Sequence, residues 1–194
     1  MHVLCFGAGA IGSLVGARLA QSGVAVTLLA RRDHVAAIRT RGLIVEGPRG
    51  RSVCKNIDAI AWLDDLATPP DLVLLTVKAY HTAAALEVLR PLWRDPVTIV
   101  SLQNGVGNEE MIAAAAGAER TFAGTITISA SRPRPGVVRQ HTRVGGIGVA
   151  PLDPRQDASS LVALFRRAGI RAALYREYRR MKWRKLLLNL FTNA

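Results

Sequence analysis

A glycine-rich stretch near the start of the chain constrains the fold more than any other feature. Residues 2–12, HVLCFGAGAIG, run from a short apolar segment into glycines spaced G-x-G-x-x-G, and apolar positions then recur at a helical period through residue 20. A strand, a tight turn and a helix in immediate succession favour a dinucleotide site over a glycine-rich turn without a ligand. Gly7 would allow the sharp turn and Gly9 the approach of a pyrophosphate, while Gly12 would let the helix pack against the strand.

The second apolar segment predicts which dinucleotide is bound. Residues 24–30 form a nearly all-apolar strand that ends at Arg31-Arg32. In NAD-preferring sites an acidic residue at this point binds the ribose 2′-hydroxyl, whereas a guanidinium suits a 2′-phosphate by its charge and forked donors. We therefore expect NADP(H). The alternative is a solvated arginine pair that happens to follow a strand.

Two further apolar segments end in polar residues. Residues 71–77 are followed by Lys78, and residues 97–102 are followed by Gln103-Asn104. In an open sheet of parallel strands, ligands bind at the carboxyl ends of the strands. The pattern predicts an α/β fold with a Rossmann-type, doubly wound, mostly parallel sheet and a ligand site at that edge.

The middle of the chain contains shorter strand signals. Residues 43–55 resemble a β-hairpin around the sequence GPRG, and residues 121–129 read as another strand. We expect a turn at 133–136 because it contains two prolines and a glycine. Beyond that turn, residues 137–141 and 144–149 are expected to pair with each other.

Composition limits the classes of partner. With 194 residues, 49% of them hydrophobic, the chain can bury a substantial core. The net charge of +12 suggests nucleic acid, but the arginines are scattered and aromatic residues make up only 5%, too few for a stacking platform. We expect no nucleic-acid partner, and part of the charge would serve an anionic cofactor and an anionic substrate.

The cysteines and the first residues of the chain indicate the cellular compartment of the protein. Cys5 and Cys54 are the only cysteines, and neither a disulfide framework nor a metal-binding spacing is present. The first strand begins almost at Met1, which leaves no room for a signal peptide. No segment is long and apolar enough to span a bilayer. We therefore expect a cytoplasmic protein with no bound metal and no membrane partner.

The last segment, residues 177–194, has the pattern of one helix. Lys185, Asn189 and Asn193 lie at i, i+4 and i+8, so they share one face. Spacing alone favours an ordinary solvated face. The alternative is a buried polar stripe, which would need hydrogen-bond partners.

Several motifs together resemble the 2-dehydropantoate 2-reductase (ketopantoate reductase) family, and the similarity runs from Met1 to Ala194. The motifs are, in chain order, the glycine motif at 7–12, Arg31, VKAY at 77–80, LQNGVG at 102–107 and the set Trp183-Arg184-Lys185-Leu186, Asn189 and Asn193. The last two are the most specific, because the glycine motif alone would fit any Rossmann enzyme.

The resemblance implies a division of the chain and a set of site residues. Residues 1–176 would form an NADP(H)-binding Rossmann domain, and 177–194 would be the first helix of an all-helical substrate domain that is otherwise missing. The implied cofactor-binding residues are Gly7, Gly9, Ala10, Ile11, Gly12, Arg31, Lys78 and Asn104. Lys185 would be the general acid, and Asn104, Asn189 and Asn193 would bind the substrate.

The implied activity is the NADPH-dependent reduction of 2-dehydropantoate to pantoate in pantothenate and coenzyme A biosynthesis. An ammonium aimed at the carbonyl oxygen of a small anionic 2-oxo acid would stabilise the growing negative charge and then supply the proton. Alternatives are a reductase of another 2-oxo acid and a non-catalytic NADPH-binding regulatory domain. The chain could also form a homodimer, which the sequence does not decide.

The family chain continues for roughly a hundred residues more, the size of a whole domain. If the 194 residues are the whole polypeptide, we expect NADPH binding with little or no turnover. The apolar side of the last helix would then be exposed and prone to association.

Overall fold

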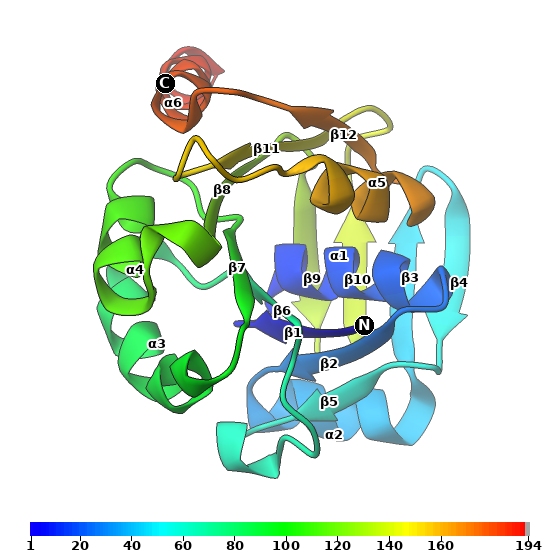
Figure 1. Cartoon of the computed structure of the whole chain (residues 1–194). Helices are drawn as coiled ribbons and strands as arrows, with labels where there is room; N and C mark the ends of the chain where they lie inside the picture. The colour runs from blue at the N-terminus through cyan, green and yellow to red at the C-terminus, as the bar shows by residue number, and fades with distance from the viewer. Residues whose placement is uncertain (193–194) are drawn as a thin grey trace.

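The computed structural model describes residues 1–192 and contains a large central sheet (Figure 1). Its strands are β1 (His2–Phe6), β2 (Ala25–Leu29), β5 (Asp58–Ile60), β6 (Leu72–Leu75), β7 (Thr98–Ser101), β8 (Thr121–Ile126), β11 (Gly146–Pro151) and β12 (Arg171–Leu174). The order across the sheet is β12-β11-β8-β7-β6-β1-β2-β5. All neighbours pair in parallel except β8 and β11. The strand order on either side of β1 is that of a Rossmann fold.

Helices cover both faces of this sheet, which confirms the doubly wound architecture. They are α1 (Ala10–Gln21), α2 (Arg32–Arg41), α3 (Thr82–Leu89), α4 (Asn108–Ala116), α5 (Ser159–Arg167) and α6 (Tyr178–Thr192). Figure 1 shows α3 and α4 on one side of the sheet and α1 and α5 on the other. Alternating residues of β1 explain this, because Val3 and Cys5 join the core cluster of α1 whereas Leu4 and Phe6 join that of α3.

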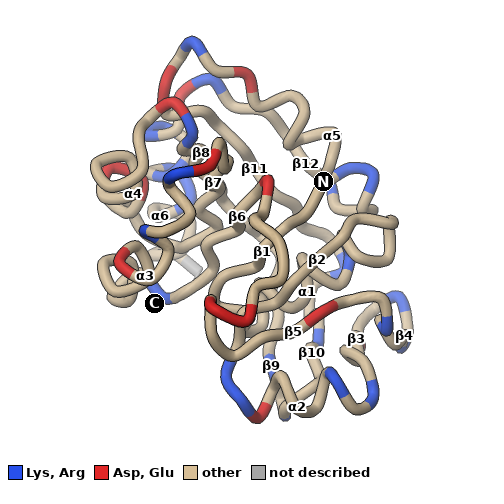
Figure 2. Tube along the Cα trace, turned by 60° about the horizontal axis from the view of Figure 1, so that its bottom comes forward, with Lys and Arg blue, Asp and Glu red and all other residues tan. Residues whose placement is uncertain are grey.

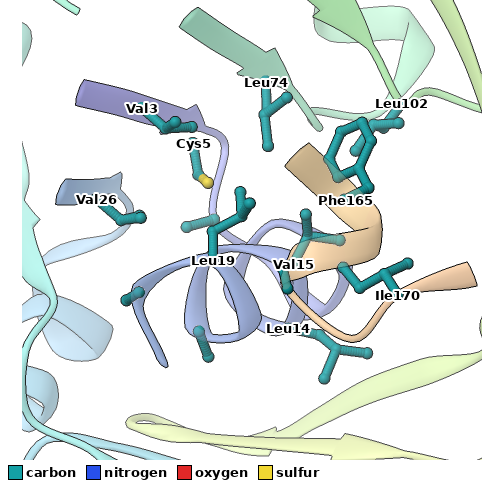
Figure 3. Packing of buried hydrophobic residues seen from close by; sticks show 14 of the residues in the cluster. Val3, Cys5, Leu14, Val15, Leu19, Val26, Leu74, Leu102, Phe165 and Ile170 are labelled. Carbon is teal, nitrogen blue, oxygen red and sulfur yellow. The ribbon is translucent and has the colours of Figure 1, made fainter. Parts of the chain in front are cut away.

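A second sheet covers the outer side of α1. Its strands, in the order β4-β3-β10-β9, are β3 (Leu43–Gly47), β4 (Gly50–Cys54), β9 (Ala130–Arg134) and β10 (Val137–Gln140). Because α1 lies between two sheets, its apolar residues are buried on nearly all sides. Figure 3 shows Leu14, Val15 and Leu19 of α1 among core side chains that include Cys5 and Phe165.

The hairpin expected at 43–55 is confirmed, since β3 and β4 pair antiparallel. The turn expected at 133–136 is confirmed at residues 135–136, which join the antiparallel strands β9 and β10, although β9 extends through Arg134. The pairing expected between residues 137–141 and 144–149 is wrong. Strands β10 and β11 do not pair with each other, because β10 pairs with β3 and β9 in the small sheet and β11 with β8 and β12 in the large one.

Helix α6 confirms the helix expected at the end of the chain over residues 178–192. It packs on β8 and β11 of the large sheet, where Met181 forms a small cluster with Ala123 of β8 and Ala150 of β11. Its later turns expose apolar side chains, among them Leu190 at 60% and Phe191 at 84% of their surface. Among residues 1–192, no helix has the length and apolar character needed to cross a membrane.

Candidate functional site

The glycine turn between β1 and α1 is held by close packing. Gly7 has φ of +84°, and a Cβ there would lie 2.9 Å from the backbone nitrogen of Val77. A Cβ on Gly12 would collide with the side chain of Thr76, whose hydroxyl donates to the carbonyl of Gly7 over 2.9 Å. The chain's own packing therefore requires glycine at both positions, as the motif predicts.

Gly9 differs, because nothing in the chain crowds it. The nearest atom to a Cβ built there is the Gly7 carbonyl oxygen at 3.8 Å. Gly9 is exposed and precedes the first turn of α1, where the N–H groups of Ala10, Ile11 and Gly12 have no partner within the helix. Open space beside free N–H groups and the positive end of a helix suits a phosphate. The residues present thus fit a pyrophosphate at this turn.

The two arginines after β2 have different surroundings. The Arg32 guanidinium lies 5.3 Å from the centre of the Trp62 ring, in a cation–π contact. Arg31 is exposed, and among residues 1–192 no ion pair involves it. Arg31 precedes the first residue of α2 at the carboxyl edge of the sheet. It is therefore available to an anionic group arriving at that edge.

Lys78 and Asn104 lie beyond the carboxyl ends of neighbouring strands, β6 and β7, and both are exposed. Buried side chains fix the loops that carry them. The Gln103 amide donates to the Val77 carbonyl at 3.1 Å, and the Asn108 amide donates to the Asn104 carbonyl at 3.1 Å. The two loops are thus bonded to each other and to the start of α4, so the exposed side chains project from a rigid edge.

A buried ion pair, which the sequence analysis did not single out, ties α6 to this edge. Lys182 and Glu109 have side chains only 3% and 1% exposed, and their charged atoms lie 2.8 Å apart. The ammonium of Lys182 also donates to the carbonyl of Gln103 over 2.7 Å and to that of Gly124 over 3.4 Å. The spacing i, i+3 and i+7 places Lys182 on the same helix face as Lys185 and Asn189, and this signal could have pointed to it.

The remaining predicted site residues follow on the same face of α6. Lys185 and Asn189 are both half-buried. Lys185 lies about 4.5 Å further along the helix axis than Lys182, which touches the residue before Asn104. Asn193 lies outside the described residues. The structure thus brings the turn of α6 that contains Lys182 and Lys185 to the loop after β7. The catalytic role of Lys185 stays a prediction.

A second buried group unnoticed in the sequence supports the glycine turn from behind. The N–H of Gly136 donates to Nδ1 of His34 at 2.8 Å, so the other nitrogen, Nε2, carries the proton and faces the Ser13 hydroxyl at 3.0 Å. That hydroxyl donates to the carbonyl of Ala8 at 3.1 Å. Burial, aided by the positive charge of Arg132, lowers the pKa of His34 to about 4. His34 is therefore neutral near pH 7 and serves as a structural link.

Other reactive groups are few. Burial raises the pKa of the Cys5 thiol to about 12, so it is a packing residue rather than a nucleophile. Within residues 1–192, no group of three His, Cys, Asp or Glu side chains could hold a metal ion.

Comparisons with known proteins agree with this geometry. Residues 3–154 match the family described as ketopantoate reductase PanE/ApbA. The 2-dehydropantoate 2-reductase of Pyrococcus horikoshii is 37% identical over 190 residues, which cover 97% of this chain and 61% of that protein.

Solved structures show the same fold. The 2-dehydropantoate 2-reductase of Geobacter metallireducens superposes with a TM-score of 0.91 at 34% identity, over 98% of this chain and 63% of that one. A ternary structure of D-mandelate dehydrogenase with NADH and anilino(oxo)acetate gives 0.89 at 25% identity, over 97% of this chain and 61% of that one. The present chain thus spans less than two thirds of the length of these proteins. By sequence and by fold, it belongs to the ketopantoate reductase family.

Proposed function

We propose that the protein takes part in the NADPH-dependent reduction of 2-dehydropantoate to pantoate, a step of pantothenate and coenzyme A biosynthesis, in the cytoplasm. The observation that carries the proposal is the open space at Gly9, in front of the free N–H groups of α1 and at the carboxyl edge of the sheet. Residues 1–176 would bind the cofactor, and residue 177 would begin the part that binds the substrate. The two cysteines are both free thiols, which suits a reducing compartment.

The cofactor side of the site would use three exposed side chains. Arg31 would form paired hydrogen bonds with the 2′-phosphate, while Lys78 and Asn104 would face the nicotinamide ribose and the reacting centre. Bound NADPH would supply the hydride that reduces the 2-oxo carbon. The rigid loops described above would hold Lys78 and Asn104 at fixed positions, which lowers the entropic cost of aligning the reactants.

The substrate side would lie along α6. The Lys185 ammonium would donate a hydrogen bond to the 2-oxo oxygen, stabilise the negative charge that grows there and then release its proton to it. The amides of Asn189, Asn193 and Asn104 can donate to a carboxylate or accept from a hydroxyl, so they suit the other polar groups of a 2-oxo acid.

The proposal predicts a specific effect of removing the acid. Lys185→Ala should lower turnover by about 10²–10⁴-fold, because it removes the proton donor, while leaving NADPH affinity nearly unchanged. The assay follows the absorbance of the reduced nicotinamide with 2-dehydropantoate as substrate, and NADPH binding is titrated separately. Exposed Lys55→Ala is the control. Unchanged turnover in Lys185→Ala would refute the assigned role.

The choice of cofactor is tested at Arg31. Arg31→Ala should weaken NADPH binding at least tenfold and leave NADH binding almost unaltered, because only NADPH carries the 2′-phosphate. Equal losses for both dinucleotides would contradict the assignment. A protein that binds NADPH normally and reduces no 2-oxo acid would instead be a regulatory NADPH-binding domain.

A reductase of another 2-oxo acid is the second candidate. The fold similarity to D-mandelate dehydrogenase, solved with NADH and anilino(oxo)acetate, favours it. An enzyme of that kind would reduce a 2-oxo acid with an aromatic substituent faster than 2-dehydropantoate. Comparing kcat/KM for the two substrates, each with NADPH and with NADH, separates the candidates.

A further inference from the structure

A small cavity rimmed by arginines lies beside the middle of α1. It has a volume of about 70 Å³, and Arg18, Arg49, Arg143 and Arg171 line it. Buried Leu14 and Ile170 contribute to its apolar wall. In the described part of the chain, no aspartate or glutamate lines the cavity and none of these arginines forms an ion pair. Within residues 1–192, the positive charge around the cavity is therefore not balanced by an acidic side chain.

The fold brings these arginines together from separate parts of the sequence. Arg18 belongs to α1, Arg49 to the turn between β3 and β4, Arg143 to the loop before β11, and Arg171 begins β12. Figure 2 shows basic positions spread over much of the molecule, including the region of β3 and β4. The convergence at the cavity is therefore a product of tertiary structure, invisible in the scattered arginines of the sequence.

The surroundings of Arg18 show the effect of bringing these positive charges together. Its guanidinium is half-buried, and burial together with the positive charge of Arg49 lowers its pKa. Its hydrogen bond to the Gln140 side chain is long, at 3.4 Å, as is that from Arg49 to the Gly169 carbonyl. Both guanidinium groups therefore keep donors that an incoming acceptor can use. Like charges crowded in a partly buried place favour binding of an anion.

The cavity is separate from the proposed cofactor site. Arg18 follows Gly9 by nine residues, which places it about 13 Å further along the axis of α1. None of the glycine-motif residues, nor Arg31, lines the cavity. Its volume of about 70 Å³ is several times the ~10–15 Å³ of comparable space that one water molecule needs. A single tetrahedral oxyanion therefore fits in it.

We propose that this cavity is a second anion site, which binds a phosphate group through the guanidinium groups of Arg18, Arg49, Arg143 and Arg171. Planar guanidinium groups donate paired hydrogen bonds to phosphate oxygens and suit them better than other cations do. The phosphate could be free or be carried by a small monoester whose carbon chain points to solvent, and the chemistry of recognition is the same.

The test measures binding of inorganic phosphate and of glycerol 3-phosphate by titration calorimetry. Both are titrated into the 194-residue chain carrying Arg31→Gln and Gly9→Ala, which removes competition from the proposed 2′-phosphate and pyrophosphate sites. We expect one site in this background. Adding Arg171→Gln or Arg49→Gln should weaken binding at least tenfold, whereas adding Arg94→Gln, an exposed arginine away from the cavity, should not.

The outcomes are distinct. Tighter binding of glycerol 3-phosphate would identify a phosphate monoester as the ligand class, and equal binding would identify free phosphate. Absence of binding would overturn the proposal, and so would equal weakening by the cavity variants and by Arg94→Gln, which would show non-specific attraction to a basic surface. Because Arg49 and Arg171 are exposed, their variants should keep the melting temperature of the parent without phosphate.

Discussion

At the scale of single residues, the three glycines of the first turn have different structural roles. Gly7 and Gly12 are required by neighbouring atoms of the chain, whereas Gly9 borders open space. The motif predicted the turn and a separate role for each glycine. It could not identify Val77 and Thr76 as the neighbours that make glycine necessary at positions 7 and 12, because it records spacing alone.

Two alanine substitutions, at Gly7 and at Gly9, test the roles of these glycines separately. Gly7→Ala should destabilise the fold by about 1–3 kcal/mol or more, because its positive φ is strained for alanine and the Cβ meets Val77. Gly9→Ala should cost less stability yet reduce NADPH affinity at least tenfold, because its Cβ occupies the space for the pyrophosphate. Thermal melts and NADPH titration of both variants check this. Undiminished NADPH binding by Gly9→Ala would contradict the assignment of the turn.

His34 gives the stability a defined dependence on pH. Its pKa is about 4 in the folded chain and about 6.5 when unfolded, so the stabilisation is complete above pH 6.5 and is lost as pH falls towards 4. The loss should be roughly 3 kcal/mol over that window. Asp33 and Arg132, whose charged groups lie 3.9 Å apart, flank the histidine.

The measurement is urea unfolding between pH 4 and 7.5. His34→Gln should be less stable at pH 7.5 and should show a shallower decline with acid, whereas His81→Gln, which replaces an exposed histidine, should follow the parent curve. Identical slopes for His34→Gln and the parent would show that His34 binds a proton equally well in the folded and the unfolded chain, and would contradict its lowered pKa.

At the scale of elements, local signals predicted most strands and helices, and the errors have physical reasons. Pro133 suggested an earlier start of the turn, but β9 is the outermost strand of the small sheet, where a missing N–H is tolerated. The three-residue strand β5 is too short to show a pattern. The partner of β10 is β3, about ninety residues earlier, and no local pattern encodes such a pairing.

The first turns of α6 depend on the Lys182–Glu109 pair. Lys182→Met should destabilise the protein by about 3–5 kcal/mol, because it leaves a buried carboxylate without its cation. The double variant Lys182→Met/Glu109→Gln should recover a large part of that loss, since neither charge remains. Denaturant unfolding of both single variants and the double variant gives the coupling energy. The exposed Lys55→Met is the control, and purely additive effects would disprove the pairing.

At the scale of the whole molecule, composition predicted a substantial core, and the nearly all-apolar strands predicted a sheet covered on both faces. The second sheet around α1 and the convergence of arginines beside it could not be predicted, because both depend on contacts between distant segments. The spacing of Lys182 places it on the helix face of Lys185 and Asn189, but spacing alone does not show that Lys182 is buried. A sequence pattern describes one element at a time, whereas the burial of a side chain depends on which other elements pack against it.

The apolar side chains on the late turns of α6 should make the isolated chain associate. Leu187, Leu190 and Phe191 are 50–84% exposed. Replacing all three with glutamine should lower the average mass measured by light scattering at high protein concentration, without altering NADPH affinity. Val144→Gln, at an equally exposed position on a distant loop, should have no effect. A mass that is independent of concentration in the parent chain would contradict this expectation.

The anchoring of Lys182 also limits how the protein can move. Its ammonium is clamped between a carboxylate and two carbonyl oxygens, so swinging the start of α6 away from the sheet would strip a buried charge of every partner. We therefore expect any opening and closing over the nicotinamide to pivot beyond residue 182. Lys185, the proposed proton donor, would then lie close to the pivot, while the groups proposed to bind the rest of the substrate would move furthest.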